Sequence, residues 1–411
     1  MKVLGLIVEY NPFHHGHLYH LQQSVKKSQA DVVIAVMSGS FLQRGEPALV
    51  DKWSRTRMAL QGGVDLVVEL PYIYSTQKAE IFAEGAIALL DSLSVTDICF
   101  GSEEGQIEPF IETVHWLNKN QKLININLKK ELAKGKSYPR AFSDVYRSLR
   151  ATNDVLDLTQ PNNILGFHYV QSVMERNSSI HVHTIKRTGA HFHDQEMTGK
   201  KIASATAIRK HLNTKEGQKS DIQSYVPEFT HAELSHYYST KGSFHSWEDY
   251  FFYLQHKIIS ESSEEMKQLY ECEEGLEYRI KREIIQASSF EEFIQKLKTK
   301  RYTRTRLQRL LVHLYLNTTK SFMNNALKEI TPPYIRVLGM SQKGQKHLST
   351  IKDDRSVPII TRASESDHPV LEKDIVASRL HSIIHHASGS SFMDEYRAIP
   401  IQYDKNTKEF L

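Results

Sequence analysis

The chain has 411 residues, 40% of them hydrophobic and 24% charged, and this composition excludes wholesale disorder. The 52 lysines and arginines nearly balance 48 aspartates and glutamates, so a net charge of +4 does not by itself identify a partner. The two cysteines, Cys99 and Cys272, argue against a disulfide framework or a cysteine-based zinc site and fit the reducing cytoplasm.

The length favours two domains, because one hydrophobic core usually serves roughly 100 to 200 residues. We place them at residues 1–215 and 216–411. The apolar run that opens the chain is much shorter than the roughly 18 residues that a membrane span needs, and no cleavable leader pattern follows it. The sequence therefore predicts a soluble, cytoplasmic protein with no membrane partner, and it leaves the oligomeric state open.

Short apolar or β-branched runs alternate with helical patterns through the first half of the chain. The five runs predicted as strands are residues 3–8, 32–37, 65–70, 96–100 and 180–185. Helical patterns begin near His17, Asp51, Thr76 and Asn162. Strands separated by helices of this length favour right-handed crossovers, so we predict an α/β Rossmann-like domain with a parallel sheet. Ligands of such sheets bind beyond the carboxyl ends of the strands, so the loops after the first and fourth runs are candidate sites.

The loop after the first run reads Glu9-Tyr10-Asn11-Pro12-Phe13-His14-His15-Gly16-His17. Pro12 ends the strand, and Gly16 allows the backbone to approach a ligand closely where a helix begins. A helix N-terminus offers free N–H groups and the positive end of its dipole, both suited to a triphosphate. His14 and His17 can donate hydrogen bonds to phosphate oxygens as negative charge builds up on them. The loop therefore has the features of a phosphate site.

Two other interpretations of this loop remain. It can be an ordinary histidine-rich surface loop, or His14, His15, His17 and His20 can hold a metal ion. We disfavour a metal site because the loop lacks the acidic helical partner of an HExxH motif, and it lies where a Rossmann-like sheet binds nucleotide. We therefore predict no metal held by protein residues.

Single positions at the ends of later strands are further candidates for the site. Gly101 ends the fourth run, Asn162 follows Pro161 at a helix start, and Arg187 follows the fifth run. Each has an alternative interpretation. Gly101 can be a plain turn glycine, Asn162 a helix cap and Arg187 a solvated arginine. The loop from Ser38 to Ala48 carries two glycines and Arg44 and is suited to a small carboxylate, with an ordinary glycine-rich loop as the alternative.

A second motif, Ile202-Ala203-Ser204-Ala205-Thr206-Ala207-Ile208-Arg209, precedes a helical pattern. Ser204 and Thr206 can cap a helix whose free N–H groups face phosphates. Arg209 lies one turn further on and can reach phosphate oxygens. A capped surface helix is the alternative interpretation.

After about residue 215 helical patterns dominate, as in 247–259 and in the spacing of Leu307, Leu310, Leu311 and Leu314. The segment 331–333, Thr-Pro-Pro, interrupts this mainly α-helical C-terminal region, and residues 362–374 are polar and loop-like. Six basic residues lie within twelve positions and can neutralise several phosphates: Lys298, Lys300, Arg301, Arg304, Arg306 and Arg309. We expect Arg306 and Arg309 to extend along the edges of an exposed face. A solvated helix face is the other interpretation.

These motifs together resemble a known family. Residues 14–17 are similar to the HxGH signature, and residues 202–209 to the ISSTxIR signature, of the HIGH nucleotidyltransferase superfamily. Ala205 departs from the serine that is frequent there, and no KMSKS-like loop points to a synthetase. Over nearly the whole chain, the segments 38–48, 101–105, 161–166 and 186–189 resemble the tRNA(Met) cytidine acetate ligase family.

The resemblance implies that ATP adenylates acetate, with Mg²⁺ as the expected companion of ATP, and that the acetyl group then passes to N4 of the wobble cytidine of elongator tRNA(Met). It implies catalytic roles for His14, His17 and Arg209 and a tRNA-binding role for the six basic residues. The residues that it assigns to ATP binding are Ile7, Val8, Glu9, Tyr10, Asn11, Pro12, Phe13, His14, His15, Gly16, His17, Leu18, Tyr19, His20, Gly101, Asn162, Arg187, Ser204 and Thr206.

Two alternative functions stay open at this point. One is a HIGH-type adenylyltransferase that acts on a small phosphorylated metabolite, although such a substrate does not explain a long helical region with a basic cluster. The other is a tRNA-binding protein with an inert nucleotide site, which the presence of both histidines, Gly16 and Arg209 argues against. No residue can be assigned as the general base of the acetyl-transfer step from the sequence.

Overall fold

The computed structural model describes residues 1–136, 138–149, 156–187, 204–214, 222–273, 275–352, 357–385 and 394–411. Four residues of the predicted motifs lie outside this part: Thr188, Gly189, Ile202 and Ala203. The predicted domain boundary at 215/216 also lies outside it, so the division of the chain stays a prediction.

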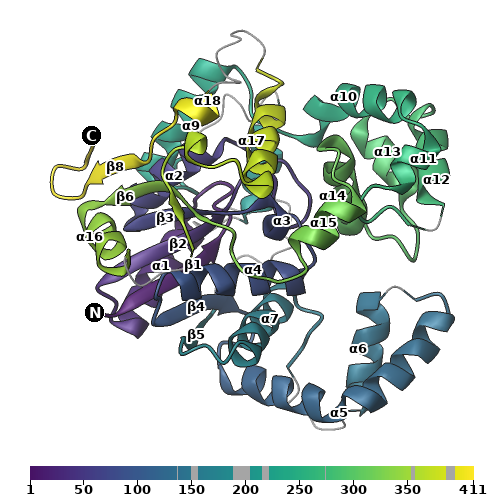
Figure 1. The fold of residues 1–411 in the computed structure, drawn as a ribbon, viewed down its shortest axis with the longest axis horizontal. Coiled ribbons are helices and arrows are strands. Elements are labelled where there is room, and N and C mark those ends of the chain that lie inside the picture. Colours follow the sequence, from purple (N-terminus) through teal and green to yellow (C-terminus); the bar gives the residue numbers. More distant parts are fainter. Residues whose placement is uncertain are drawn as a thin grey trace.

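Strands and helices alternate in the first half of the chain (Figure 1). The strands are β1 (Val3–Val8), β2 (Val32–Ser38), β3 (Leu66–Leu70), β4 (Asp97–Ser102) and β5 (His181–Lys186). The helices are α1 (His15–Ser28), α2 (Lys52–Gly62), α3 (Tyr72–Ser75), α4 (Ala79–Ser92), α5 (Glu108–Ala133), α6 (Tyr138–Leu149) and α7 (Pro161–Glu175). The predicted Rossmann-like succession is confirmed, with the five strands at the expected places.

The second half is mainly helical, as predicted. Its helices are α8 (Ala205–Leu212), α9 (Glu228–Lys241), α10 (Trp247–Ser260), α11 (Ser263–Lys267), α12 (Leu276–Ile284), α13 (Phe290–Leu297), α14 (Arg304–Tyr315), α15 (Lys320–Ala326), α16 (Gln342–Ile351), η2 (Ala363–Glu365), α17 (Pro369–Ser382) and α18 (Asp394–Arg397). Its described part also contains the strands β6 (Ile335–Ser341), β7 (Ile359–Ile360), β8 (Ile401–Asp404) and β9 (Glu409–Phe410). The polar stretch 362–374 is therefore partly helical rather than a continuous loop.

The strands of both halves form one sheet in the order β5-β4-β1-β2-β3-β6-β8-β9, with β7 beside β6. The pairs from β5 to β3 are parallel, whereas β6 runs antiparallel to β3. The sheet is thus mixed rather than purely parallel. β7, β8 and β9 are too short to show a strand period in the sequence. β6 has seven residues, as many as β2, and was not predicted from the sequence.

Helices cover both faces of the sheet. Because successive side chains of a strand point to opposite faces, Val3 and Leu4 of β1 belong to two different hydrophobic cores. One core includes α1, α2, α8 and α9. The other includes α4 and α7 and continues into the helices α10 to α14, which cluster on one side of the sheet in Figure 1. One continuous hydrophobic core therefore joins the helical cluster to the sheet and its helices.

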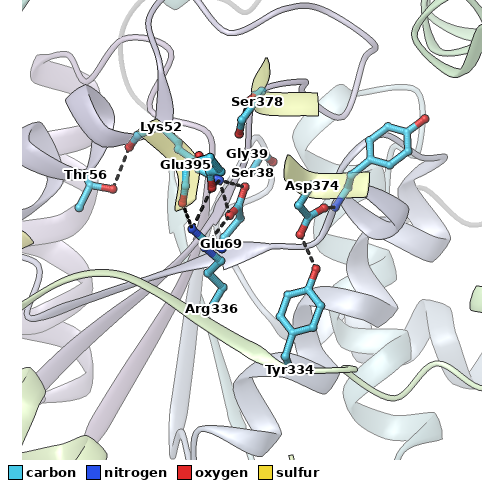
Figure 2. A network of polar contacts seen from close by, with 12 residues as sticks. Ser38, Gly39, Lys52, Thr56, Glu69, Tyr334, Arg336, Asp374, Ser378 and Glu395 are labelled. Carbon is cyan, nitrogen blue, oxygen red and sulfur yellow. Dashed lines mark hydrogen bonds and ion pairs between the residues drawn. The ribbon is translucent and has the colours of Figure 1, made fainter. Parts of the chain in front are cut away.

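A buried ionic network ties the C-terminal segment to the sheet (Figure 2). Lys52 Nζ lies 2.7 Å from Glu69 Oε2 and 2.6 Å from Glu395 Oε1. Arg336 of β6 lies 2.9 Å from the same Glu395 oxygen. Next to this network, Tyr334 donates a hydrogen bond to Asp374, whose pKa burial raises to about 7. The network joins residues from α2, β3, β6 and α18 (Figure 2).

Candidate active site

A cleft of about 1810 Å³ opens at the carboxyl ends of β1, β4 and β5. Residues of α5, α6 and α14 also line it, so it extends from the sheet to the helical cluster. A pocket for one small molecule usually measures about 300 to 1,000 Å³. The cleft therefore has room for more than one small ligand.

The turn between β1 and α1 places two histidine rings face to face. His14 is the N-cap residue of α1, and its Nδ1 accepts a hydrogen bond from the Gly16 N–H at 3.0 Å. His17 Nδ1 accepts one from the His14 N–H at 3.3 Å. The rings stack with centroids 3.8 Å apart. Each histidine ring thus accepts a hydrogen bond from a backbone N–H at the start of the helix. In an ordinary capping box, serine and glutamate side chains accept these bonds.

This geometry fixes the protonation of both rings. An Nδ1 that accepts a hydrogen bond carries no proton, so the proton of each neutral ring is on Nε2. Burial, and then the nearby charge of Arg187, lowers the pKa of His14 to about 3. Burial also holds the pKa of His17 well below its usual range. Both side chains line the cleft as neutral rings, and the His17 ring also forms a hydrogen bond with the Pro12 backbone.

Arg187 and His20 lie beside this pair, above Gly101. A Cβ on Gly101 would stand 3.3 Å from Arg187 Cγ and 3.7 Å from His20 Cδ2, so glycine leaves room for both side chains. Burial lowers the pKa of Arg187, which stays a cation, and burial together with Arg187 lowers the pKa of His20 to about 4. The structure therefore brings the predicted residues of β4 and β5 to the histidine turn.

The second predicted motif meets the first one at the cleft. Ser204 caps α8 by accepting a hydrogen bond from the Ala207 N–H at 3.1 Å, as predicted. Arg209 donates to the Asn11 carbonyl at 3.0 Å and to Glu46 Oε2 at 3.0 Å. Thr206 Oγ1 accepts a weaker bond from Arg209 at 3.4 Å. These contacts hold the Arg209 guanidinium at the edge of the cleft, opposite the start of α1.

Some predicted ATP-binding residues have a different position from the one expected. Pro12, Phe13, His15 and Leu18 do not line the cleft. Phe13, for example, is completely buried and packs against the rings of Tyr10 and His17. Asn162 lines the cleft but does not cap α7, because the N-cap residue is Gln160 and the Asn162 amide donates to Glu103 Oε1 at 2.6 Å.

Sequence reasoning missed the acidic partners of the site. Glu46 pairs with Arg209 although the two residues are 163 positions apart. In the same loop the Gln43 N–H donates to Glu9 Oε1 at 2.9 Å, and burial lowers the pKa of Arg44. The glycines and Arg44 of the loop 38–48 mark it as a candidate in the sequence, but nothing in the sequence indicates which side chain Glu46 meets.

The basic cluster divides into two groups. Arg301, Arg306 and Arg309 line the cleft, whereas Lys298, Lys300 and Arg304 do not. The expected exposed position of Arg309 is wrong. Its side chain is 11% exposed and its Nε lies 3.2 Å from Glu271 Oε1. Because α14 packs with that side toward Glu271, Arg309 is partly a structural residue.

Clusters of metal-binding side chains and membrane-spanning helices are both absent from the described residues. Within them no three or more His, Cys, Asp or Glu side chains are grouped so that they could hold a metal ion. No helix of the described part is long and apolar enough to cross a bilayer.

The doubly covered α/β sheet, the HxGH turn at a helix N-terminus and the arginine of the second motif define a HIGH-type nucleotidyltransferase site. The HIGH Nucleotidyl Transferase family model matches residues 1–395. The tRNA(Met) cytidine acetate ligases of Bacillus velezensis and Bacillus subtilis are 47% and 45% identical to the chain, each over 100% of both proteins.

Two crystal structures of Thermotoga maritima TmcAL are also similar. The apo form is 34% identical with a TM-score of 0.91, and the form bound with alpha-thio ATP is 33% identical with a TM-score of 0.89. Each alignment covers 98% of this chain and 100% of the other. The chain therefore belongs to the tRNA(Met) cytidine acetate ligase family of HIGH nucleotidyltransferases.

Proposed function

We propose that this protein is an ATP-dependent ligase that activates acetate as acetyl-adenylate and acetylates N4 of the wobble cytidine of elongator tRNA(Met). AMP and pyrophosphate would be the other products. The full-length similarity to proteins with this named activity supports the proposal, as does the related structure with bound alpha-thio ATP. The reaction would take place in the cytoplasm, where tRNA and ATP are found.

The observation that carries the first half-reaction is the set of donors around the start of α1. An acetate oxygen attacks the α-phosphorus, and the bond to the pyrophosphate oxygen breaks. Acetate is already ionised at neutral pH, so this step needs positioning and charge stabilisation but no base. The neutral rings of His14 and His17 supply N–H donors, and Arg187 and Arg209 supply positive charge on two sides. Such preorganised donors stabilise the charge that develops on the leaving group.

The size and composition of the cleft support the second half-reaction. Its volume of about 1810 Å³ can hold a nucleotide together with a base of a single-stranded loop. Arg301 and Arg306 line the cleft from the helical cluster, where they are suited to a phosphate backbone. A wobble base is unpaired, so the enzyme spends no energy on opening a duplex.

Mg²⁺ stays an expectation that accompanies ATP. The described residues hold no group of three potential metal-binding side chains, so the ion would be bound mainly by the ATP phosphates. Mg²⁺ would neutralise phosphate charge there.

The proposal is tested by ATP–pyrophosphate exchange with and without acetate, followed by acetylation of tRNA(Met). Exchange that depends on acetate, one acetyl group per tRNA and AMP as the nucleotide product are expected. ADP as the product would show attack at a different phosphorus. Exchange that depends on a phosphorylated metabolite instead of acetate, or no exchange despite tRNA binding, would favour one of the two alternative functions.

A further inference from the structure

Glu9 is the residue that directly follows β1, where the strand opens into the cleft. Its Oε1 accepts a hydrogen bond from the Gln43 N–H at 2.9 Å, and the described residues place no cationic side chain in an ion pair with it. The carboxylate is thus held in one orientation by a neutral backbone donor. It lies between the histidine turn and the loop 38–48, the two segments that border the proposed acetate and phosphate positions.

The other carboxylates that line the cleft are engaged in ion pairs. These are Glu46 with Arg209 at 3.0 Å, Glu80 with Lys78 at 2.6 Å, Asp144 with Lys136 at 2.6 Å, Glu271 with Arg309 at 3.2 Å and Glu273 with Arg306 at 3.2 Å. A neighbouring cation stabilises the ionised form of a carboxylate and makes it a weaker base. Burial also raises the pKa of Glu271, but its ion pair with Arg309 occupies that carboxylate. Among the described carboxylates of the cleft, Glu9 is therefore the one best placed to accept a proton.

The surroundings of Glu9 increase its basicity. Burial raises its pKa above the usual range, and the negative charge of Glu46 acts in the same direction. The Gln43 N–H and the charges of Arg209 and Arg44 oppose this increase without cancelling it. Arg55 of α2 and Tyr169 of α7 also face the carboxylate. A raised pKa brings a carboxylate nearer to the operating pH, which is what an efficient general base requires.

We propose that Glu9 is the general base of the acetyl-transfer step, an inference that rests on the proposed function. The N4 amine attacks the carbonyl carbon of acetyl-adenylate, and a C–N bond forms. The bond between that carbon and the phosphate oxygen breaks, and AMP leaves with the electron pair. The surplus proton of the amine passes to a carboxylate oxygen of Glu9. Adenylation needs no base, so Glu9 acts as a base in the second half-reaction alone.

The test is Glu9→Gln in the full-length protein. The amide oxygen of glutamine can still accept the Gln43 N–H, so the variant keeps the shape of the site and loses the basic oxygen. Acetyl transfer is measured in single turnovers from enzyme-bound acetyl-adenylate to tRNA(Met), and adenylation is measured by pyrophosphate exchange. We expect transfer to fall about 10²- to 10⁴-fold, the usual contribution of a general base. Because Glu9 is also one of the predicted ATP-binding residues, the ratio of the two rates is the readout, and transfer should fall at least about tenfold more than exchange. Glu80→Gln, in the same cleft, is the matched control and should change neither rate.

The pH profile gives a second readout. The wild-type transfer rate should rise with pH through the pKa of Glu9, and Glu9→Gln should lose that limb while exchange keeps its profile. Unchanged transfer in Glu9→Gln, or an equal loss of exchange, would overturn the role of Glu9. If Glu9→Gln does not fold, a wild-type transfer rate without an acidic limb overturns it instead. Wild-type protein that acetylates no tRNA at all would refute the proposed function itself.

Discussion

Gly45 lies directly against the backbone of Arg309, with no space for a side chain between them. A Cβ on Gly45 would stand 2.3 Å from the Arg309 nitrogen, and the residue has a φ of +73°. The Gly45 carbonyl also accepts a hydrogen bond from Trp247 Nε1 at 2.8 Å. This contact joins the loop 38–48 of the sheet half to α14 and α10, so the position of the helical cluster depends on the same loop that borders the cleft.

Gly45→Ala should therefore destabilise the protein and loosen the helical cluster. A positive φ and a clash with backbone atoms together cost roughly 2 to 4 kcal/mol. Urea unfolding measures this loss of free energy. Gly242→Ala is the matched control, because Gly242 has a φ of +83° but nothing within 4 Å of a Cβ. Equal losses in the two variants would mean that the contact with Arg309 contributes nothing.

His17→Ala should abolish most pyrophosphate exchange and leave tRNA binding nearly intact. It removes one preorganised N–H donor and also the acceptor of the His14 N–H, and the loss of one such donor usually costs about 10²- to 10³-fold in rate. Exchange assays and tRNA titration check both halves of the prediction. Near-normal exchange in the folded variant would contradict the assignment. The exposed His236 of α9 provides a control substitution, His236→Ala.

Arg304→Ala together with Arg306→Ala should weaken tRNA binding and reduce its salt dependence. Both arginines pair with exposed carboxylates, Glu291 and Glu273, which phosphates can replace. Each lost phosphate contact lowers the log–log slope by roughly 0.7 to 0.9. We leave Arg309 out of this variant because its loss would expose Glu271 as an unpaired buried charge. A slope equal to that of wild type, and of the control Arg282→Ala, would show that the cluster is only a solvated face.

Lys52→Met should destabilise the fold without a direct effect on the cleft, which Lys52 does not line. Lys52 is 1% exposed and holds both Glu69 and Glu395, so its removal leaves two buried carboxylates with Arg336 as their nearby cation (Figure 2). Breaking a buried ion pair from one side usually costs about 3 to 5 kcal/mol. In contrast, Lys78→Met removes an exposed pair and should cost less than about 1 kcal/mol. Denaturant unfolding of both variants decides whether the network has this role.

The stability of the protein should decrease as the pH falls below the ordinary histidine pKa of 6.5. Burial lowers the pKa of His313 to about 3 and that of His381 to about 4, so these rings stay neutral in the folded protein. The unfolded chain takes up protons from 6.5 downward, and the folded chain does so only near these lower values. Between pH 6.5 and the lowered pKa of each ring, the free energy of unfolding therefore falls by up to about 1.4 kcal/mol per ring for each pH unit.

The variant His313→Asn isolates one such ring, because the asparagine amide can replace Nδ1 as a partner of the Tyr72 hydroxyl. Its unfolding free energy should change less between about pH 7.5 and pH 5 than that of wild type. Identical pH dependence in the two proteins would show that His313 is not the neutral buried ring described above.

Local patterns in the sequence determined the first half of the fold and the family. The runs that became β1 to β5 are long enough to show strand character, and the HxGH turn depends on neighbours within three residues. The capping role of Ser204 is equally local. The roles of the predicted site residues in binding and catalysis stay predictions.

The tertiary structure alone decided the partners that lie far apart in the sequence. Glu46 meets Arg209, Glu271 meets Arg309, and Glu395 reaches Lys52 across more than half of the chain. The pairing of β6 with β3, which makes the sheet mixed, belongs to the same group. These contacts leave no local pattern in the sequence, because each one depends on how whole helices and strands pack against one another. The basicity of Glu9 has the same origin, since burial by several distant elements raises its pKa.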